Sequence, residues 1–317
     1  MSKEELIRKL DFIQHEKDAK HLNIYVTADG ELQLFNIDQK DLDELLPLYV
    51  EFLTEGVINN KDLDLGKYSI STSRENMIYQ YDLDENTRTQ EMKYMAFAGT
   101  ETNPKYFVCD ESSLENIDGL YAVINDEENR IVMYKQIIPV EKTYGCKSYL
   151  FGCKHDKSQF ERKRYSMIRI TPGMQMLYVD GDIILVEMNK LEKTLGLNAI
   201  LQKESEATFQ CVYEKDMIQD INKLKEACEK PSLLKKLRHA LTESKTKIMS
   251  KEDILKYAKT QKKLKFKFNS DMSMFILDSR AAAERFIKLL DDDYLYSQMT
   301  NTEYDSAQKS VLGEIVE

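Results

Sequence analysis

Two Asp-Gly pairs, Asp29-Gly30 and Asp180-Gly181, each stand between two short apolar stretches, and around the first pair apolar residues alternate with other residues. Asp-Gly is typical of a two-residue turn between antiparallel strands, because both turn residues need a positive φ. Residues 120–124 and 131–138 flank a further polar turn and predict a third hairpin. The sequence therefore predicts antiparallel sheet, and this limits the possible folds more than any other feature.

Helical patterns separate these hairpins. Near the amino terminus, Leu6, Leu10 and Ile13 recur at helical spacing. Hairpins mixed with helices, without regular strand–helix alternation, predict an α+β fold with mixed, largely antiparallel sheets and flanking helices, in two domains. Further helices are predicted over residues 41–53, 188–195, 197–244, 250–259 and 281–290, and short strands over residues 68–70, 77–81 and 106–109.

Charge is distributed unevenly along the 317 residues, whose overall net charge is −10. Residues 1–130 hold 13 Lys and Arg against 28 Asp and Glu, and the remaining residues have a net charge of +5. Such asymmetry is a pointer to contact with nucleic acid or another anionic surface. We predict an acidic amino-terminal α+β domain over residues 1–135 and a carboxy-terminal α+β domain with basic segments over residues 136–317.

The compartment follows from three further features. No run approaches the ~18 to 20 apolar residues that a membrane-spanning helix needs. The amino terminus has acids where a signal peptide would have bases. The five cysteines are odd in number and scattered, unlike a disulfide framework. We expect a cytoplasmic protein with reduced thiols.

A first basic segment covers residues 142–169, with eight bases, two acids and five aromatic residues between them. Bases neutralise phosphates, and exposed aromatic rings stack on unpaired bases, so this mixture is typical of a nucleic-acid contact. The alternative is a solvated loop whose aromatic rings anchor it to the core. The candidate DNA-binding residues here are Lys154, Lys157, Arg162, Lys163 and Arg164.

A second basic segment covers residues 230–267, with thirteen bases and three acids. Its last lysines alternate with Leu264, Phe266 and Phe268, which predicts a strand with one lysine-rich face. Lysine-rich edges also block sheet aggregation, which is the alternative. Because Lys outnumbers Arg, contacts with DNA should be mostly to the backbone and independent of sequence. The candidates are Lys235, Lys236, Arg238, Lys259, Lys262, Lys263, Lys265 and Lys267.

Catalytic motifs are scarce. The four histidines form no local Ser-His-Asp or Cys-His pattern, and no glycine-rich phosphate loop is present. Cys146 and Cys153 lack the second ligand pair of a zinc site. Residues 291–293 or Asp180 with Asp182 could hold Mg²⁺ in a nuclease, although a helix end and a hairpin tip explain them more simply. We expect no cofactor and favour a non-catalytic protein; a metal-dependent nuclease and a protein-interaction scaffold are the alternatives.

Two stretches resemble a known family. Arg169-Ile-Thr-Pro-Gly173, continuing through the hairpin at Asp180-Gly181 to Leu195, is similar to the middle of KwaB-type proteins of the bacterial Kiwa anti-phage system. The stretch from Leu264 to Tyr304, including Asp291-Asp-Asp-Tyr-Leu-Tyr-Ser297, is similar to the end of that family. The likeness covers roughly the last half of the chain.

The resemblance implies a homodimeric DNA-binding effector of antiviral defence. It further implies a KwaA-like integral membrane partner that recruits the cytoplasmic protein to the inner membrane, where the two block phage DNA replication and expression. It transfers no catalytic residue to this sequence.

Overall fold

The computed structural model has an α+β fold and describes residues 1–14, 20–108, 113–138, 142–143, 150–153, 160–163, 167–297 and 302–306. The chain forms two compact units: residues 1–66 with 74–195, and residues 67–73 with 196–317. The predicted acidic and basic domains would divide between residues 135 and 136, which lie in β6 (Arg130–Gln136). That division by charge stays a prediction.

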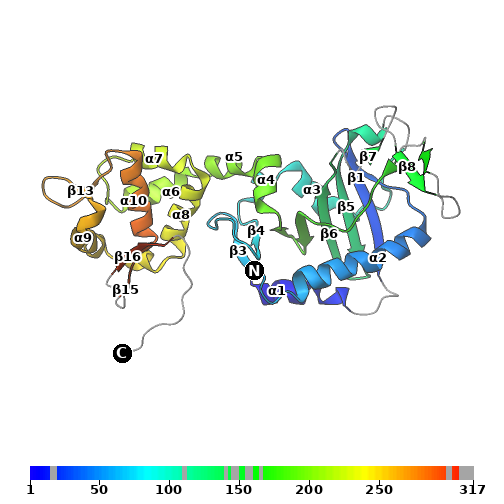
Figure 1. Cartoon of the computed structure of the whole chain (residues 1–317), viewed down its shortest axis with the longest axis horizontal. Coiled ribbons are helices and arrows are strands. Elements are labelled where there is room, and N and C mark those ends of the chain that lie inside the picture. Colours follow the sequence, from blue (N-terminus) through cyan, green and yellow to red (C-terminus); the bar gives the residue numbers. More distant parts are fainter. Residues whose placement is uncertain are drawn as a thin grey trace. The chain divides into compact units, whose positions relative to one another are not determined.

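The first unit is built on an eight-stranded sheet (Figure 1). All pairings from β2 to β4 are antiparallel, so the predicted α+β fold with largely antiparallel sheet is confirmed. In spatial order the strands are β2 (Glu31–Leu34), β1 (His21–Ala28), β5 (Ile117–Asn125), β6, β11 (Met176–Val179), β12 (Asp182–Leu185), β4 (Met77–Gln80) and β3 (Asp64–Lys67).

Both Asp-Gly pairs form the expected turns. Ala28 pairs with Glu31 across the first turn, and Val179 pairs with Asp182 across the second. The φ values are 52° and 74° at Asp29-Gly30, and 48° and 87° at Asp180-Gly181. Two positive φ angles match the twist of the flanking strands and fix the register of each hairpin.

Helices α1 (Lys3–Leu10) and α2 (Gln39–Leu53) cover one face of this sheet. Leu6 and Leu10 of α1 and Tyr49 of α2 pack in one core with Leu22 and Ile24 of β1, and all five are fully or almost fully buried. Ser2 caps α1 by accepting a hydrogen bond from Glu5 N at 3.2 Å. Burial of this apolar face holds the helices against the sheet.

Helix α3 (Gln90–Phe97) lies on the opposite face, where the ring of Tyr94 packs edge-on against Tyr121 of β5. Arg130 on β6 closes the end of α3: its guanidinium donates to the carbonyls of Met95, Ala96 and Ala98. The carbonyls of a helix's last turn have no partner within the helix, so this side chain satisfies groups that would otherwise lose hydrogen bonds.

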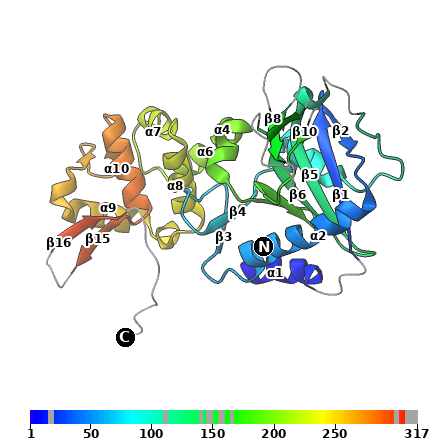
Figure 2. The ribbon, with the colours of Figure 1, turned by 45° about the vertical axis from the view of Figure 1, so that its right-hand side comes forward.

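The second unit is mainly helical (Figure 2). Phe286 of its last helix is fully buried, as are Leu224, Cys228 and Leu234 of two neighbouring helices. The helix α4 (Met188–Thr194) ends the first unit, and Gly196 follows at a φ of 66°. The helices of the second unit are α5 (Leu197–Lys203), α6 (Glu206–Glu214), α7 (Asn222–Cys228), α8 (Pro231–Thr242), α9 (Lys251–Thr260) and α10 (Arg280–Leu290).

Short elements complete the described chain. Antiparallel pairs join β7 (Lys142–Thr143) to β10 (Met167–Ile168), β8 (Leu150–Cys153) to β9 (Phe160–Lys163), β13 (Lys267–Phe268) to β14 (Phe275–Ile276), and β15 (Tyr294–Ser297) to β16 (Thr302–Asp305). Single turns of 3-10 or π helix are η1 (Asp11–Ile13), η3 (Thr54–Ile58), η4 (Glu85–Thr87), η5 (Ser113–Asn116), η7 (Lys245–Ile248) and η8 (Lys262–Leu264). Within the described ranges, the helices are too short or too polar to span a bilayer.

The strand predicted over residues 68–70 is wrong. Those residues form a turn, and the segment 67–73 belongs to the second unit. Tyr68 is fully buried, and the Lys235 ammonium of α8 lies 4.0 Å from its ring centroid. Lys67 forms an ion pair of 2.7 Å with Glu243. These contacts with distant residues determine the conformation of the segment, so its local alternation misleads.

Candidate nucleic-acid interface

Helix α9 presents lysines outward because its apolar residues face the core. Ser250 caps the helix by accepting a hydrogen bond from Asp253 N at 3.1 Å. Ile254 and Leu255 are buried, whereas Lys256 and Lys259 are exposed. The amphipathic pattern of this helix therefore fixes the direction of both ammonium groups.

After α9 the lysines are exposed because the aromatic residues between them pack into the core. Phe266 and Phe268 both pack on the fully buried Phe275, with ring centroids 5.6 and 5.1 Å from it. Lys265 and Lys267, which alternate with these rings, are exposed. The two phenylalanines thus anchor the segment to the core while the intervening lysines face solvent.

The predicted strand here is only partly present. Lys263 lies in η8, and Lys265 follows it with a left-handed φ of 51°, so neither is in a strand; only Lys267 is. A left-handed residue reverses the chain direction and ends the alternation. Lys263 and Lys265 are nevertheless both exposed.

We call residues 256–267 the lysine stretch. It contains six lysines and no acid. Lys267 has a neighbouring carboxylate, since its ammonium lies 2.5 Å from Asp278. That ammonium holds the pKa of Asp278 below its ordinary value. Lys259 lies 5.8 Å from the ring centroid of Phe268. For Lys262 the structure describes the backbone but not the side chain. The lysine stretch therefore combines exposed positive charge with an anchored backbone.

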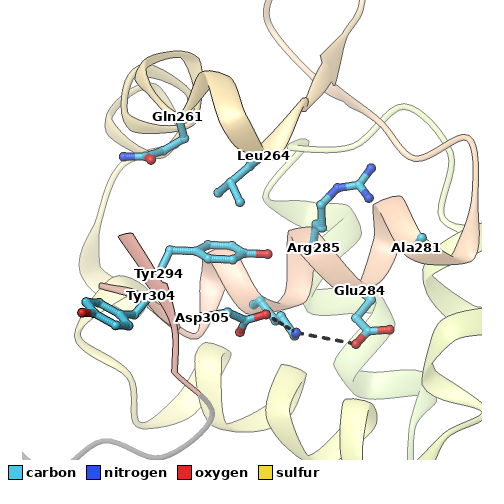
Figure 3. A pocket seen from close by; sticks show the side chains of 9 residues that line it. Gln261, Leu264, Ala281, Glu284, Arg285, Tyr294, Tyr304 and Asp305 are labelled. Carbon is cyan, nitrogen blue, oxygen red and sulfur yellow. Dashed lines mark hydrogen bonds and ion pairs between the residues drawn. The ribbon is translucent and has the colours of Figure 1, made fainter. Parts of the chain in front are cut away.

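A cavity of about 410 Å³ opens beside the lysine stretch. Two of its lining residues, Gln261 and Leu264, belong to that stretch. Glu284, Arg285 and Lys288 line it from α10, and Tyr294, Tyr304 and Asp305 line it from the β15–β16 hairpin, as Figure 3 shows. We call this cavity the tyrosine pocket. No role was predicted from sequence for Arg285, Tyr294 or Tyr304; the one local signal is the pair of tyrosines, Tyr294 and Tyr296, that follows the acidic residues 291–293.

The cations of α8 have different surroundings. Lys235 is 2% exposed, with its ammonium over the ring of Tyr68. Lys236, with a side chain 12% exposed, pairs with Asp293 and lies 3.5 Å from Asp291. Arg238 donates to Thr208 Oγ1 at 3.1 Å and to the carbonyl of Glu204. All of these contacts are with residues of the second unit. The contacts named here do not involve the lysine stretch.

The first basic segment is described only in part. Arg162 and Lys163 lie on β9, where the structure gives the backbone. Lys154, Lys157 and Arg164 lie outside the described residues. The contribution of this segment to a DNA interface stays a prediction.

The acids considered for a nuclease site face cations. The Lys9 ammonium lies 3.1 Å from Asp180 and 3.0 Å from Asp182. Asp291 and Asp293 are buried, and the Nδ1 atom of His239 lies 2.5 Å from Asp291. Over the described ranges, no group of three or more His, Cys, Asp or Glu side chains is arranged to hold a metal ion.

Comparisons with known proteins give two matches. The family model "Kiwa protein KwaB-like" matches residues 114–300. The chain is 19% identical over 296 residues to the Kiwa protein KwaB of Escherichia coli O55:H7 (strain RM12579 / EPEC), an alignment that covers 92% of this chain and 93% of that protein. No solved structure matches.

Proposed function

The chain belongs to the KwaB-like family of Kiwa anti-phage defence, and on this premise we propose that it is a defence effector that binds DNA through the lysine stretch. The observation that carries the proposal is the set of exposed lysines over residues 256–267, where no acid intervenes. Clustered ammonium groups repel one another, and a phosphate backbone relieves that repulsion.

The contact should be independent of base sequence. An ammonium group is a point charge, whereas bidentate reading of a base edge uses the planar guanidinium of Arg. The lysine stretch contains no Arg. Lys259, Lys263 and Lys265 would therefore bind phosphate oxygens and set the position of the DNA without reading its bases.

The overall net charge of −10 does not oppose this binding. Charges on a protein surface are screened over about 8 Å at physiological ionic strength. The charges nearest to the DNA therefore dominate binding, and over residues 256–267 these are six lysines without an acid.

We also propose the assembly that the family resemblance implies. In it, a homodimer is recruited from the cytoplasm to the inner membrane by a KwaA-like integral membrane protein, and together they block phage DNA replication and expression. The acidic residues 1–130 are candidates for the partner contact. Membrane fractionation of cells with and without the partner tests this: the chain should sediment with membranes only when the partner is present.

A salt series tests DNA binding. Each phosphate that the protein neutralises lowers log K by about 0.9 per unit of log salt concentration. Titration of duplex DNA at several salt concentrations should give a steep negative slope. Replacing Lys259, Lys263 and Lys265 with Gln should reduce the magnitude of that slope by up to about 2.7, which corresponds to three lost contacts.

The matched control replaces Lys61, Lys93 and Lys203 with Gln. These three lysines are also exposed, and the variant has the same change in net charge. It should keep the wild-type slope. Equal slopes for both triple variants would remove the lysine stretch from the account of DNA binding.

A further inference from the structure

The charged side chains that line the tyrosine pocket have no net charge, and two tyrosine rings line the pocket beside them. Arg285 and Lys288 line it together with Glu284 and Asp305, so its lining cations and anions are equal in number. Such a site has no net attraction for a phosphate, unlike the neighbouring lysine stretch. Aromatic walls with a few polar groups are typical of sites for flat, uncharged rings.

Resting on the DNA-binding function proposed above, we propose that the tyrosine pocket takes an unpaired base of single-stranded DNA while the lysine stretch holds the adjoining phosphates. Gln261 and Leu264 place the pocket directly beside the lysine stretch, because they line the pocket and also lie within that stretch. A strand whose backbone follows the lysines would therefore bring its bases to the pocket.

The apolar part of the pocket suits stacking. Figure 3 shows the side chain of Leu264 above the ring of Tyr294, with the hydroxyl end of that ring directed toward the side formed by Arg285. Tyr304 lines the pocket from β16 and is 48% exposed, so one part of its ring is open to solvent. Exposed tyrosine rings stack on bases of any sequence because every base has a π face.

The polar part of the pocket offers an unsatisfied donor. The Nε atom of Arg285 is buried and has no hydrogen-bond acceptor among the described residues. Buried donors in folded proteins are nearly always paired, so this one calls for an acceptor. Because this atom has almost no accessible surface, a ring nitrogen or carbonyl oxygen of a base would reach it only after a rotation of the Arg285 side chain.

The other charged groups that line the pocket form ion pairs with one another. Lys288 lies 2.7 Å from Asp305 and 3.7 Å from Glu284. Although burial alone would lower it, the hydrogen bond to Asp305 raises the pKa of Lys288 above its ordinary value. Burial and the Asp305 charge raise the pKa of Tyr294, so its hydroxyl stays protonated and can donate. The Tyr294 hydroxyl is thus the donor that a base in the pocket would meet first.

The size of the cavity also favours a single base over a duplex. At about 410 Å³ it is within the usual range for a small-molecule site. A paired base is stacked and cannot enter it without leaving the helix. The pocket would therefore give the protein a preference for unpaired DNA.

The test compares short oligo(dT) with an abasic oligomer of the same length, which has the same phosphates without bases. One stacked base contributes about 1–3 kcal/mol, so the wild-type protein should bind oligo(dT) about 5- to 150-fold more tightly than the abasic strand. Equal affinities would overturn the pocket proposal while leaving DNA binding by the lysine stretch intact. If neither strand binds at low salt, the proposed function itself fails.

Variants locate the preference. Tyr304→Leu should bring the affinity ratio of the two strands close to one without changing binding of the abasic strand, and Tyr304→Phe should restore the ratio. Tyr213→Leu, at a tyrosine of α6 that is 67% exposed, is the control and should keep the wild-type ratio. A ratio unchanged in Tyr304→Leu, or one lost equally in Tyr213→Leu, would overturn the assignment to this pocket.

Thymidine monophosphate separates a strand site from a site for free nucleotides. It has the base and one phosphate, but it cannot span the lysine stretch. It should compete with oligo(dT) only at concentrations far above the Kd of the strand. Competition at equal concentration would overturn the proposal in favour of a mononucleotide site.

Discussion

The cations of α8 and the lysines of residues 256–267 belong to the same basic segment, yet the second unit uses them differently. Lys236 on α8 is 12% exposed and pairs with two aspartates. Lys259, Lys263 and Lys265 are exposed. Both groups are basic, and neither α8 nor residues 256–267 contains an acidic residue.

The difference teaches that a basic segment divides according to the partners that the fold brings to it. The aspartates that pair with Lys236 stand more than fifty residues further along the chain, just after α10. A cation that is buried against carboxylates stabilises the fold, whereas the ammonium groups of the lysine stretch lie at the surface, where a phosphate can approach them. Variants that affect folding and DNA binding separately can therefore break or sharpen this comparison.

The largest effect on stability is expected for Lys236→Met. This change keeps the aliphatic length but removes the ammonium group that pairs with the buried Asp291 and Asp293. Breaking a buried ion pair by removing one partner costs about 3–5 kcal/mol. Urea denaturation followed by circular dichroism should show a loss of that size in the free energy of unfolding.

The triple change Lys236→Met, Asp291→Asn and Asp293→Asn is the control. It removes the uncompensated charges, so it should recover part of the lost stability. If Lys236→Met alone is as stable as the wild type, the ion pairs seen here do not stabilise the fold.

A smaller effect is expected for Arg238→Ala. The guanidinium donates to Thr208 Oγ1 and to the Glu204 carbonyl, and so joins α8 to α6 and to the end of α5. Hydrogen bonds from a charged group contribute about 1.5–3 kcal/mol when buried, and partial exposure reduces this to about 1–2 kcal/mol here. Thermal unfolding should register the loss. A shift in DNA affinity without a shift in Tm would instead assign Arg238 to the interface.

The smallest effect concerns the thiols of α6 and α7, which report how tightly the α8 side of the unit is packed. Cys228 is fully buried, and burial raises the pKa of its thiol to about 12. At pH 8 it stays protonated and should react with iodoacetamide only after unfolding, whereas the partly exposed Cys211 should react in the folded protein. Peptide mass spectrometry measures both. Labelling of Cys228 as fast as Cys211 would indicate a loosely packed core.

Much of the fold could be predicted from local sequence. The hairpin turns at Asp29-Gly30 and Asp180-Gly181 could be predicted because few residue types adopt a positive φ, and such a turn needs two of them in succession. The conformation of residues 68–70 could not be predicted from local sequence, because Tyr68 packs against Lys235 of α8, which is distant in sequence.

The candidate site was predictable only where exposure follows from local pattern. Lys259 is exposed because the apolar residues of α9 face inward. The strand expected through Lys263 and Lys265 is wrong because the left-handed conformation of Lys265 ends the alternation. The tyrosine pocket depends on residues from α10, η8 and two strands, so no single stretch of sequence contains its pattern.

The most direct test of the account measures Tm and DNA affinity for two variants side by side at one salt concentration. Changing Lys259, Lys263 and Lys265 to Glu should weaken duplex DNA binding by roughly 100-fold and leave Tm within about 2 °C of the wild type. Lys236→Met should lower Tm and leave the affinity of the folded protein unchanged. Wild-type affinity in the triple Glu variant, or loss of affinity in folded Lys236→Met, would contradict the division of these cations between binding and folding.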